Sequence, residues 1–473
     1  MIIRAFLVLV YSLFAASVLQ HEEVLYVIMS QKHPYHVSLA ERLQDSIEDQ
    51  VYNLEKGFPT VIISTAPGTW TVLPQLRELY DKHQQDIKWV VFCEDYTEFR
   101  LNFLHDVLSE YDHNEEHFLG HGLKDVEPTI IHHFALVENE LTYPNFGSGF
   151  AMSMGLLRTV NKVLKTYDKT KFSEFSIDPA YELAKFILEE GPEVRLTHRK
   201  EFCVVSSQTC ATYPKSYGPC GNSVPLDSLF FAVKTYHKFH NSRVQVVKKT
   251  WGKFPVHMLF FSDKNDSNIP SIELGVPNVD RGHCAKTLAI INYFSTALHL
   301  HDKALKWLVI ADDDTILSVA RLTELLSCYG HRQLALGERY GFHVWKGRVG
   351  YDYLTGGGAL VLSADLLAPL AACVCPAPTA PDDMWLGVCL SRLGVPLAHS
   401  PLFHQGRPMD YPLEYLAPHR PVSFHKHWML NPEEVYRQWF LSDDLTFSKS
   451  HPDHQEPQPE PAPADSHIRH VEL

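Results

Sequence analysis

The sequence lacks several features that mark common classes of protein. Acidic side chains outnumber basic ones, giving a net charge of −14, whereas a nucleic-acid-binding protein needs a basic surface. No Cys-x-x-Cys pair occurs among the nine cysteines, which argues against a zinc knuckle. The glycines do not have the spacing of a P-loop or a dinucleotide-binding fingerprint. We therefore expect no nucleic-acid partner, no structural zinc and no NTPase or Rossmann-type site.

Long apolar runs are also missing, apart from one at the beginning of the chain. Arg4 precedes the apolar residues 5–14, and small side chains at 15–17 suit cleavage, as in a secretory signal peptide. The run is shorter than the about 18–20 residues that a membrane span needs. We expect a signal peptide over residues 1–20 and no stable membrane insertion, the alternative being a type II membrane anchor.

The last residues, 446–473, are rich in proline and charge, which predicts an extended and solvated tail. The tail ends in His470-Val471-Glu472-Leu473, close to the Lys-Asp-Glu-Leu class of retention signals that a receptor reads. A cleaved signal peptide combined with such an ending predicts a soluble protein of the endoplasmic reticulum lumen, with the retention-signal receptor as one partner.

The nine cysteines fit an oxidising lumen, and their odd number leaves at least one unpaired. Cys93 lies within an apparent buried strand and is predicted to be a free thiol. Cys203, Cys210 and Cys220 lie in a loop-like stretch and are predicted to form disulfides, with partners that the sequence does not assign.

Four sequence landmarks occur twice, in the same order and with similar spacing. They are WVVFCEDYT (89–97) and WLVIADDDT (307–315), GSGFAMS (147–153) and GGALVLS (357–363), DPAY (178–181) and DDMW (382–385), and VRLTH (194–198) and VPLAH (395–399). Chance rarely delivers four such matches. The repetition predicts a first domain over 21–199, a Cys-containing linker over 200–227 and a second, similar domain over 228–445.

Both copies alternate strand-like runs with amphipathic stretches, which favours α/β domains with largely parallel sheets. Strands are expected at residues 24–29, 61–64, 229–235, 257–262 and 307–311. Helical patterns follow the third landmark in each copy, so each such helix should begin close to an aspartate.

The first copy departs from the second at two positions that matter for chemistry. Tyr96 stands where the second copy has Asp314, and Pro179 stands where it has Asp383. Neither replacement can ligate a hard cation or act as a carboxylate base. The first domain is therefore predicted to be non-catalytic, with a structural or acceptor-binding role.

The triplet Asp312-Asp313-Asp314 ends an apolar run in the second copy. Adjacent carboxylates repel one another unless a cation neutralises them, and oxygen ligands suit Mg²⁺ or Mn²⁺. Alternate side chains of an extended chain share a face, so Asp312 and Asp314 should point the same way. The alternative for an isolated triplet is a solvated acidic loop.

Three further groups accompany the triplet. The triple glycine before Ala359 allows a close approach of the backbone and a positive φ. At the start of an expected helix, one of Asp382 and Asp383 can cap while the other acts as a general base. Late in the domain, His425 or His427 can complete a Mn²⁺ site built on carboxylates.

As an ordered set, these motifs resemble those of the fringe-like β-1,3-glycosyltransferases over about residues 228–440. They are DDD at 312–314, GGGA at 356–359, DDM at 382–384 and FH at 424–425, with AVKT at 232–235 and TW at 250–251 before them. The resemblance implies two tandem GT-A-like domains, the first degenerate, and an inverting transferase that uses a nucleotide-sugar donor.

The resemblance also assigns roles to individual residues. Asp314 and His425 would bind the metal, and Asp383 would be the catalytic base, with Asp382 as the less favoured choice. The remaining residues would hold the nucleotide-sugar: Asp312, Asp313, Lys234, Thr235, Arg243, Gly357 and Gly358.

The whole chain, with its degenerate first copy and its two ends, resembles family members that transfer glucose. The resemblance implies UDP-glucose as donor, Mn²⁺ or Mg²⁺ as cofactor, and O-linked fucose on folded thrombospondin type 1 repeats as acceptor. Two alternatives remain: a fringe-like transferase that uses another UDP-sugar, and a non-catalytic, lectin-like quality-control protein of the endoplasmic reticulum.

Overall fold

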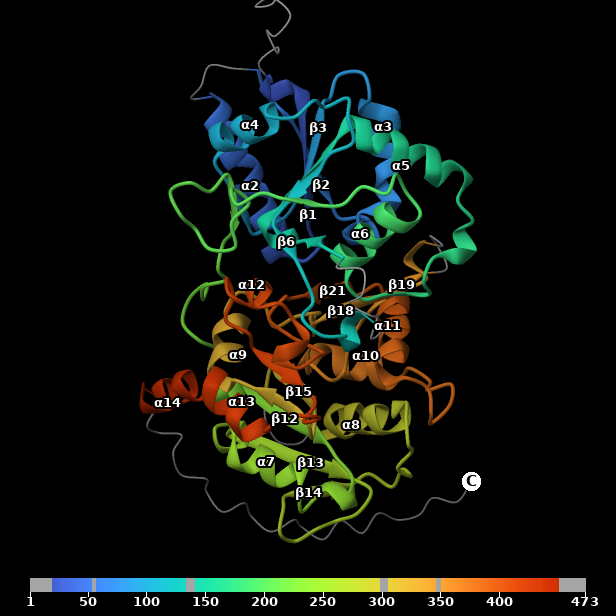
Figure 1. Ribbon diagram of the computed structural model, residues 1–473. Coiled ribbons are helices and arrows are strands. Elements are labelled where there is room, and N and C mark those ends of the chain that lie inside the picture. Colours follow the sequence, from blue (N-terminus) through green and yellow to red (C-terminus); the bar gives the residue numbers. More distant parts are fainter. Residues whose placement is uncertain (1–18, 53–56, 133–140, 298–304, 346–349, 451–473) are drawn as a thin grey trace, which may run out of the picture.

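Two mixed β-sheets, each with helices on both faces, are stacked one above the other in the computed structural model (Figure 1). The structure describes residues 19–52, 57–132, 141–297, 305–345 and 350–450.

The upper sheet belongs to the amino-terminal half. Its strands are β1 (Val24–Met29), β2 (Thr60–Ser64), β3 (Trp89–Glu94), β5 (Phe118–Gly120), β8 (Phe150–Ser153) and β10 (Thr197–His198), and its helices are α2 (Pro34–Tyr52), α3 (Leu73–His83), α4 (Leu101–Ser109), α5 (Met154–Thr166) and α6 (Pro179–Glu189). The strand order is β10-β5-β8-β3-β1-β2, and β8 runs antiparallel to both of its neighbours.

The lower sheet belongs to the carboxy-terminal half. Its strands are β12 (Leu229–Lys234), β13 (His257–Ser262), β14 (Ser271–Glu273), β15 (Trp307–Asp312), β17 (Ala335–Gly337), β20 (Leu360–Ser363) and β21 (Leu397–His399). Its helices are α7 (Arg243–Lys249), α8 (Cys284–Ala297), α9 (Val319–Leu326), α10 (Leu367–Ala371), α11 (Asp382–Leu393), α12 (Leu413–Leu416), α13 (Pro432–Trp439) and α14 (Leu441–Ser450). The strand order is β14-β13-β12-β15-β20-β17-β21.

Short strands complete the fold. They are β4 (Thr97–Phe99), β6 (Gly122–Leu123), β7 (Tyr143–Pro144), β9 (Phe175–Ser176), β11 (Thr212–Pro214), β16 (Thr315–Leu317), β18 (Arg339–Phe342), β19 (Tyr351–Leu354) and β22 (Ser423–His425).

The two sheets are copies of one arrangement. Read from the opposite end, the lower sheet repeats the strand order of the upper one, with β14 added at its edge. The register repeats as well: Trp89 lies opposite Ser153, and Trp307 lies opposite Ser363. The predicted fold class is therefore confirmed, as α/β with two tandem GT-A-like domains. The sheets are less parallel than expected, because β8 and β20 each run against both neighbours.

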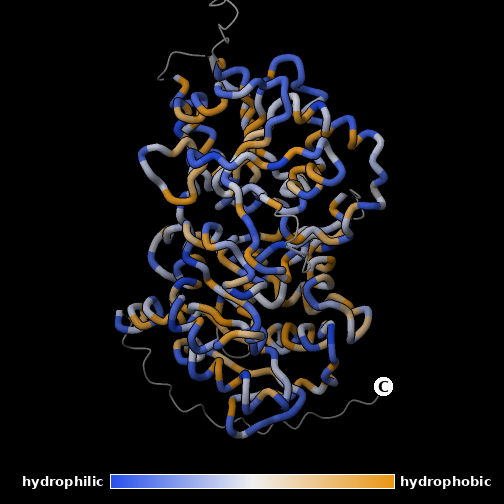
Figure 2. Tube along the Cα trace, in the orientation of Figure 1, coloured by the Kyte–Doolittle hydropathy of each residue, from blue (hydrophilic) through white to orange (hydrophobic). Residues whose placement is uncertain are grey.

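The core follows from the alternation of side chains along the central strands. In β1, Leu25, Val27 and Met29 pack beneath α3, α5 and α6, whereas Tyr26 and Ile28 pack beneath α2 and α4. Hydrophobic residues accordingly concentrate along the sheets, and hydrophilic ones on outer loops and helices (Figure 2). Each sheet is thus buried on both faces, which explains why its strands read as continuous apolar runs.

The two halves share an extensive interface. Strand β9, from the amino-terminal half, pairs with β18 and so joins a small antiparallel sheet of the other half. The side chain of Gln31 donates to the carbonyl of His399 (3.0 Å) and accepts from its backbone NH (2.7 Å). The indole of Trp70 donates to Asp352 (3.1 Å).

Four disulfides are formed, and Cys93 is a buried free thiol, as predicted. The pairs are Cys203–Cys210, Cys220–Cys328, Cys284–Cys375 and Cys373–Cys389. Disulfides in such number are typical of proteins that fold in an oxidising compartment.

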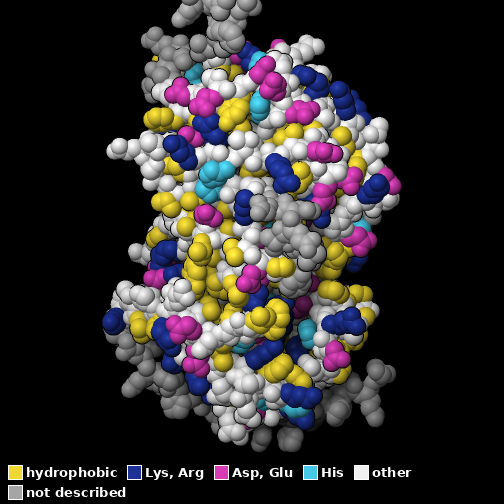
Figure 3. Space-filling model, in the orientation of Figure 1, with side chains coloured by type: hydrophobic (Ala, Val, Ile, Leu, Met, Phe, Trp, Pro, Cys, Tyr) yellow, Lys and Arg dark blue, Asp and Glu magenta, His cyan; other side chains and the backbone are white. Residues whose placement is uncertain are grey.

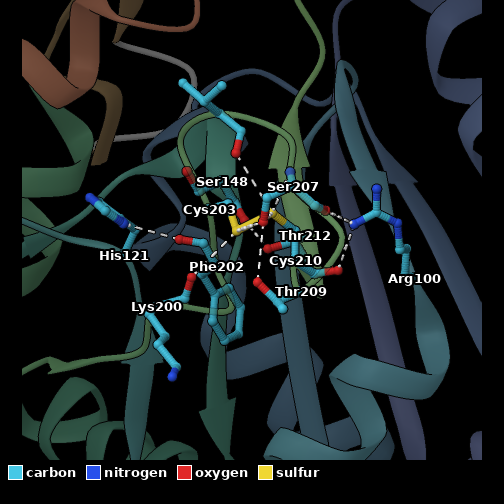
Figure 4. Close-up of a disulfide and its surroundings, with 11 residues drawn as sticks. Arg100, His121, Ser148, Lys200, Phe202, Cys203, Ser207, Thr209, Cys210 and Thr212 are labelled. Atoms are coloured by element: carbon cyan, nitrogen blue, oxygen red, sulfur yellow. Dashed lines mark hydrogen bonds between the residues drawn. A yellow bond between two sulfur atoms is a disulfide. The ribbon is translucent and has the colours of Figure 1, made fainter.

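The segment 200–227 is tied to both halves. Strand β11 pairs with β4, and the hydroxyl of Thr212 donates to the carbonyl of Ser148, close to the first disulfide (Figure 4). Arg100 donates to the carbonyl of Cys210 (3.1 Å). Further along, the Cys220–Cys328 disulfide attaches the segment to the lower half.

The two ends of the chain, 1–18 and 451–473, lie outside the described residues, and with them most of the predicted signal peptide and the retention-like ending. Helix α14 continues to Ser450, so the predicted start of the tail at residue 446 falls within a helix. No helix among the residues described is long and apolar enough to cross a membrane.

Candidate active site

A tight turn presents the carboxylates at the end of β15. Asp312 is the last residue of the strand, and the chain turns at Asp313 and Asp314 before entering β16. The hydroxyl of Thr315 accepts from the backbone NH of Asp312 (3.0 Å) and donates to the carbonyl of Gly357 (2.8 Å). The turn is therefore fastened to the glycine-rich loop.

Two carboxylates of the turn converge on one histidine. Strand β22 pairs with β16, which places His425 opposite Thr315. His425 Nε2 lies 3.2 Å from Asp314 Oδ1 and 3.7 Å from Asp312 Oδ2, and one ligand atom from each residue falls within 4.8 Å of the others. Asp312 and Asp314 do face the same way, but a turn brings them together instead of the expected extended chain. His427, the other histidine considered, lines a neighbouring cavity.

Arg243, at the start of α7, neutralises part of the cluster. Its guanidinium lies 3.1 Å from Asp313 and 3.0 Å from Asp314, while the hydroxyl of Thr235 donates to Asp313 (2.6 Å). Burial still raises the pKa of Asp313 to about 6, helped by the charge of Asp314. Burial acts on Asp314 too, but the hydrogen bond from His425 and the charges of His425 and Arg243 hold its pKa below the ordinary value.

Lys234, the last residue of β12, connects the triplet to α11. Its ammonium lies 3.0 Å from Asp312 and 2.7 Å from Asp382, which also accepts from the hydroxyl of Thr287 (2.6 Å). Burial disfavours the charged amine, but the two carboxylates outweigh it and raise the pKa of Lys234. Burial would raise the pKa of Asp382 in turn, but the charge of Lys234 and the hydrogen bonds from Lys234 and Thr287 outweigh it and lower that pKa.

Asp383 is the carboxylate that remains unpaired. Among the ion pairs of the described residues, none involves Asp383, whose Oδ1 accepts from the backbone NH of Met384 (2.7 Å). Burial and the adjacent charge of Asp382 raise the pKa of Asp383 to about 6. The expectation that one of the two aspartates caps the helix is wrong: Pro381 is the N-cap residue, and Asp382 is held by Lys234 instead.

The glycine-rich loop provides space for His425. A Cβ atom on Gly357 would lie 2.3 Å from Nδ1 of that imidazole, and one on Gly358 would lie 3.2 Å from the backbone of His404. A positive φ was expected among the glycines but occurs instead at Ala359, where φ is 70°. The matching residue of the first copy, Gly149, has nearly the same φ, 71°. Close packing, and not backbone conformation, therefore explains the glycine at 357.

Gly357→Ala should disturb the group of Asp312, Asp314 and His425, because the added Cβ would displace the ring of His425. We expect the Mn²⁺ needed for half-maximal activity to rise by about tenfold or more, as for lost orientation of a ligand. Gly356→Ala is the matched control, because its Cβ would meet nothing closer than Lys234 Nζ at 3.6 Å. Titrations of activity with Mn²⁺ for both variants test this, and equal effects would contradict it.

Seven of the predicted residues line one cavity of about 420 Å³: Lys234, Thr235, Arg243, Asp312, Asp313, Asp314 and His425. Asp382 and Asp383 are not among the residues that line it; Asp382 is linked to it through its ion pair with Lys234. Gly357 and Gly358 do not line it and act behind it, against His425 and His404. No sequence pattern pointed to six other lining residues: Tyr236, Asn278, Val279, Asp280, His283 and Lys286. Lys286 donates to the carbonyl of Thr235 (2.8 Å) and to Asn278 (2.7 Å), so its amine supports the cavity wall.

Comparison with known proteins identifies the family. A profile described as Fringe-like matches residues 224–452. The β-1,3-glucosyltransferase of Mus musculus is 43% identical over 434 residues, covering 89% of this chain and 87% of that protein. The β-1,3-glucosyltransferase of Homo sapiens is 42% identical over 432 residues, covering 89% and 85%. The chain belongs to the Fringe-like β-1,3-glucosyltransferases.

More distant relatives match a smaller part of this chain. The β-1,3-N-acetylglucosaminyltransferase lunatic fringe of Danio rerio is 29% identical over 217 residues, 39% of this chain and 56% of that protein. The family profile covers the carboxy-terminal half, whereas the two glucosyltransferase relatives extend over both halves.

In the first half of the chain, the equivalent sheet edge lies against the second half. Tyr96, in the position of Asp314, packs against Tyr217 and His419, with ring centroids 5.0 and 5.3 Å away. A cavity of about 110 Å³ remains there, between Glu94, Asp95 and Asp178 of the first half and Glu338, Arg339, His399 and Tyr415 of the second. The supporting turn survives, because Thr97 bonds Glu94 and Gly147 as Thr315 bonds Asp312 and Gly357.

Proposed function

We propose that the protein transfers glucose from UDP-glucose to O-linked fucose on folded thrombospondin type 1 repeats, with inversion at the anomeric carbon. The observation that carries this proposal is the combination of the Asp312, Asp314 and His425 group with an unpaired carboxylate at Asp383. The two curated relatives named β-1,3-glucosyltransferase support the donor sugar and the linkage.

The residues present fit a divalent cation such as Mn²⁺ or Mg²⁺. Two carboxylate oxygens and one imidazole nitrogen converge within 4.8 Å, a donor set that suits such ions. Asp314 and His425 would hold the ion, with Asp312 as an additional oxygen ligand. A cation bound there would offset the negative charge that develops on the leaving diphosphate.

The donor would occupy the cavity above β12 and β15. Asp313 is buried against Thr235 and Arg243, where its carboxylate can accept from ribose hydroxyls. Lys234 is positioned between Asp312 and Asp382, where its ammonium can contact the sugar or the diphosphate. Gly357 and Gly358 would act indirectly, by leaving room for His425 and for the chain beside it.

Asp383 would act as the general base. Its carboxylate takes the proton of the acceptor hydroxyl while that oxygen attacks the anomeric carbon and the bond to the diphosphate breaks. A single displacement of this kind inverts the anomeric configuration. Asp382 is the weaker candidate, because its carboxylate is already engaged by Lys234 and Thr287.

Activity should depend on the protonation of this base. Because the pKa of Asp383 is raised to about 6 by burial and by Asp382, the carboxylate is protonated below that pH and cannot accept a proton. We expect kcat/KM to rise with pH through about 6 and to level off above about 7. Measurements at saturating Mn²⁺ between pH 4.5 and 8 test this, and a flat profile would contradict it.

A panel of UDP-sugars tests the proposed function directly. Purified protein with Mn²⁺ and an O-fucosylated repeat should turn over UDP-glucose faster than UDP-galactose or UDP-N-acetylglucosamine. The second candidate, a transferase for another sugar, is favoured by the likeness to fringe N-acetylglucosaminyltransferases, and faster turnover of another donor would establish it. No turnover of any donor, on the repeat or on a simple fucoside, would refute both.

The proposed location is the lumen of the endoplasmic reticulum. The four disulfides support an oxidising compartment, and the retention-like sequence at 470–473 would return the protein through its receptor. Deleting the last four residues should cause secretion of the protein from cultured cells, which immunoblotting of the medium detects.

A further inference from the structure

A segment of the amino-terminal half reaches the catalytic site of the other half. It follows β6 and comprises residues 124–132, here named the arm, and it runs from the upper half onto the lower one (Figure 1). Ile131, near its end, is 6% exposed and belongs to the hydrophobic core that also contains Phe424 of β22. The arm is therefore anchored in the core of the catalytic half.

The arm lines a cavity next to the proposed metal site. This cavity of about 450 Å³ has Asp314 and Arg243 on one side, Arg407 and Trp428 on another, and Ile130 of the arm. Asp314 and Arg243 also line the donor cavity, so they form the wall that the two cavities share. An occupant of the second cavity would therefore lie directly beside the donor.

A buried clamp holds the arm in place. His132 lies between Asp125 (2.6 Å) and Asp178 (2.9 Å) and stacks on Tyr181, with ring centroids 3.8 Å apart. Tyr143 donates to Asp125 (2.7 Å). Burial alone would disfavour a charged imidazole, but the two carboxylates outweigh it and raise the pKa of His132 to about 9. The ion pairs that hold the arm therefore persist at neutral pH.

The clamp uses a carboxylate of the non-catalytic copy. Asp178 occupies the position of Asp382, which holds Lys234 in the catalytic copy. In the first half the same position caps α6 and binds His132. The residue that organises the active site in one copy thus fastens the arm in the other.

We propose that the arm binds the polypeptide that carries the acceptor sugar, an inference that rests on the proposed transfer to a protein-linked fucose. Large apolar side chains are exposed at this cavity and on the arm: Trp428 is 58% exposed, the adjacent Met429 71%, and Val126 90%. Tryptophan and methionine are enriched in protein interfaces. Hydrophobic side chains also gather across the middle of the face seen in Figure 3, where the halves meet.

A protein acceptor fits this surface better than a free sugar does. The exposed residues extend beyond the cavity, whereas a single sugar would need only the wall at Asp314 and Arg243 that the two cavities share. Trp428 is both exposed and part of the cavity wall, so a polypeptide that contacts it would present its sugar next to the donor.

Two variants test the arm. Ile130→Ser removes the apolar side chain that the arm contributes to the cavity wall, and Val126→Asp changes a side chain so exposed that folding does not depend on it. Each variant should raise the KM for the fucosylated repeat about fivefold to tenfold, which is the usual effect of removing one contact from a protein interface. The KM for UDP-glucose and the rate with p-nitrophenyl fucoside should stay within about twofold of wild type.

Ile177→Ser is the matched control. Ile177 is also a partly buried isoleucine of the first half packed on the same core, but it lines the cavity between the halves. The arm proposal is overturned if both arm variants leave the KM for the repeat unchanged, if donor or fucoside kinetics change equally, or if Ile177→Ser gives the same increase.

A binding measurement separates this proposal from the proposed function. Calorimetry with the repeat, UDP and Mn²⁺ reports acceptor affinity without turnover. If Ile130→Ser and Val126→Asp bind the repeat more weakly and Ile177→Ser binds it as wild type does, the result supports acceptor binding by the arm, even if the panel of UDP-sugars rejects glucose as the donor. Undiminished binding by both arm variants overturns it even where glucose transfer is established.

Discussion

Asp383→Asn should lower turnover by about 10³-fold, the usual contribution of a general base. Asparagine keeps the size of the side chain and can still accept from the backbone NH of Met384, but it cannot take the acceptor proton. Because Asp383 makes no ion pair within the described chain, its loss should leave UDP affinity nearly unchanged. Steady-state kinetics and calorimetry with UDP measure the two effects.

Asp227→Asn is the control for this prediction. Asp227 is an exposed carboxylate in the turn that directly precedes β12, at the opposite end of that strand from Lys234. It should behave as wild type. Turnover of Asp383→Asn within about tenfold of wild type would exclude Asp383 as the base, because general base catalysis contributes more than that.

Asp314→Asn should lower turnover by a similar factor, but because it weakens the binding of the metal. The variant removes a charged oxygen ligand from the group with Asp312 and His425. Metal-dependent stabilisation of transition-state charge is worth several kcal/mol, so we expect turnover to fall by about 10³-fold. Calorimetric titration with Mn²⁺ should show at least about a tenfold loss of affinity, because mutating a residue that only orients a metal ligand already lowers metal affinity by about that factor.

The duplicated position provides the control for Asp314. Tyr96 occupies the same place in the first copy, so Tyr96→Phe alters an equivalent turn without touching the proposed metal ligands. Its Mn²⁺ affinity and turnover should match wild type. Unchanged Mn²⁺ affinity in Asp314→Asn would show that the ion binds elsewhere.

The fold could be predicted from the sequence because its signals are local. Strands buried on both faces appear in the sequence as apolar runs, and β1 and β13 begin and end where those runs predicted. The duplication was visible because the landmarks lie at strand ends and helix starts, where the backbone limits the choice of residue. The antiparallel direction of β8 and β20 leaves no such trace.

The site could be predicted only in part. The triplet, Asp383 and His425 stand in short motifs, and the structure brings the triplet and His425 together. The pairing of Lys234 with Asp382 depends on two elements 148 residues apart in sequence, and no local pattern reveals it. The same holds for Asn278 and Lys286, which reach the cavity from other segments, and for the arm.

The edge of the upper sheet at Tyr96, which lies against the second half, limits what substitutions there can do. The sheet edge that carries the proposed metal ligands in the second copy is a contact between the halves in the first, where Tyr96 packs on Tyr217 and residues of the second half such as Arg339 and Tyr415 line the remaining cavity. Restoring carboxylates at 96 and 179 would place them in the cavity between the halves, against residues of the second half such as Tyr415. A change at 96 or 179 would therefore alter the contact between the two halves as well as the sheet edge itself.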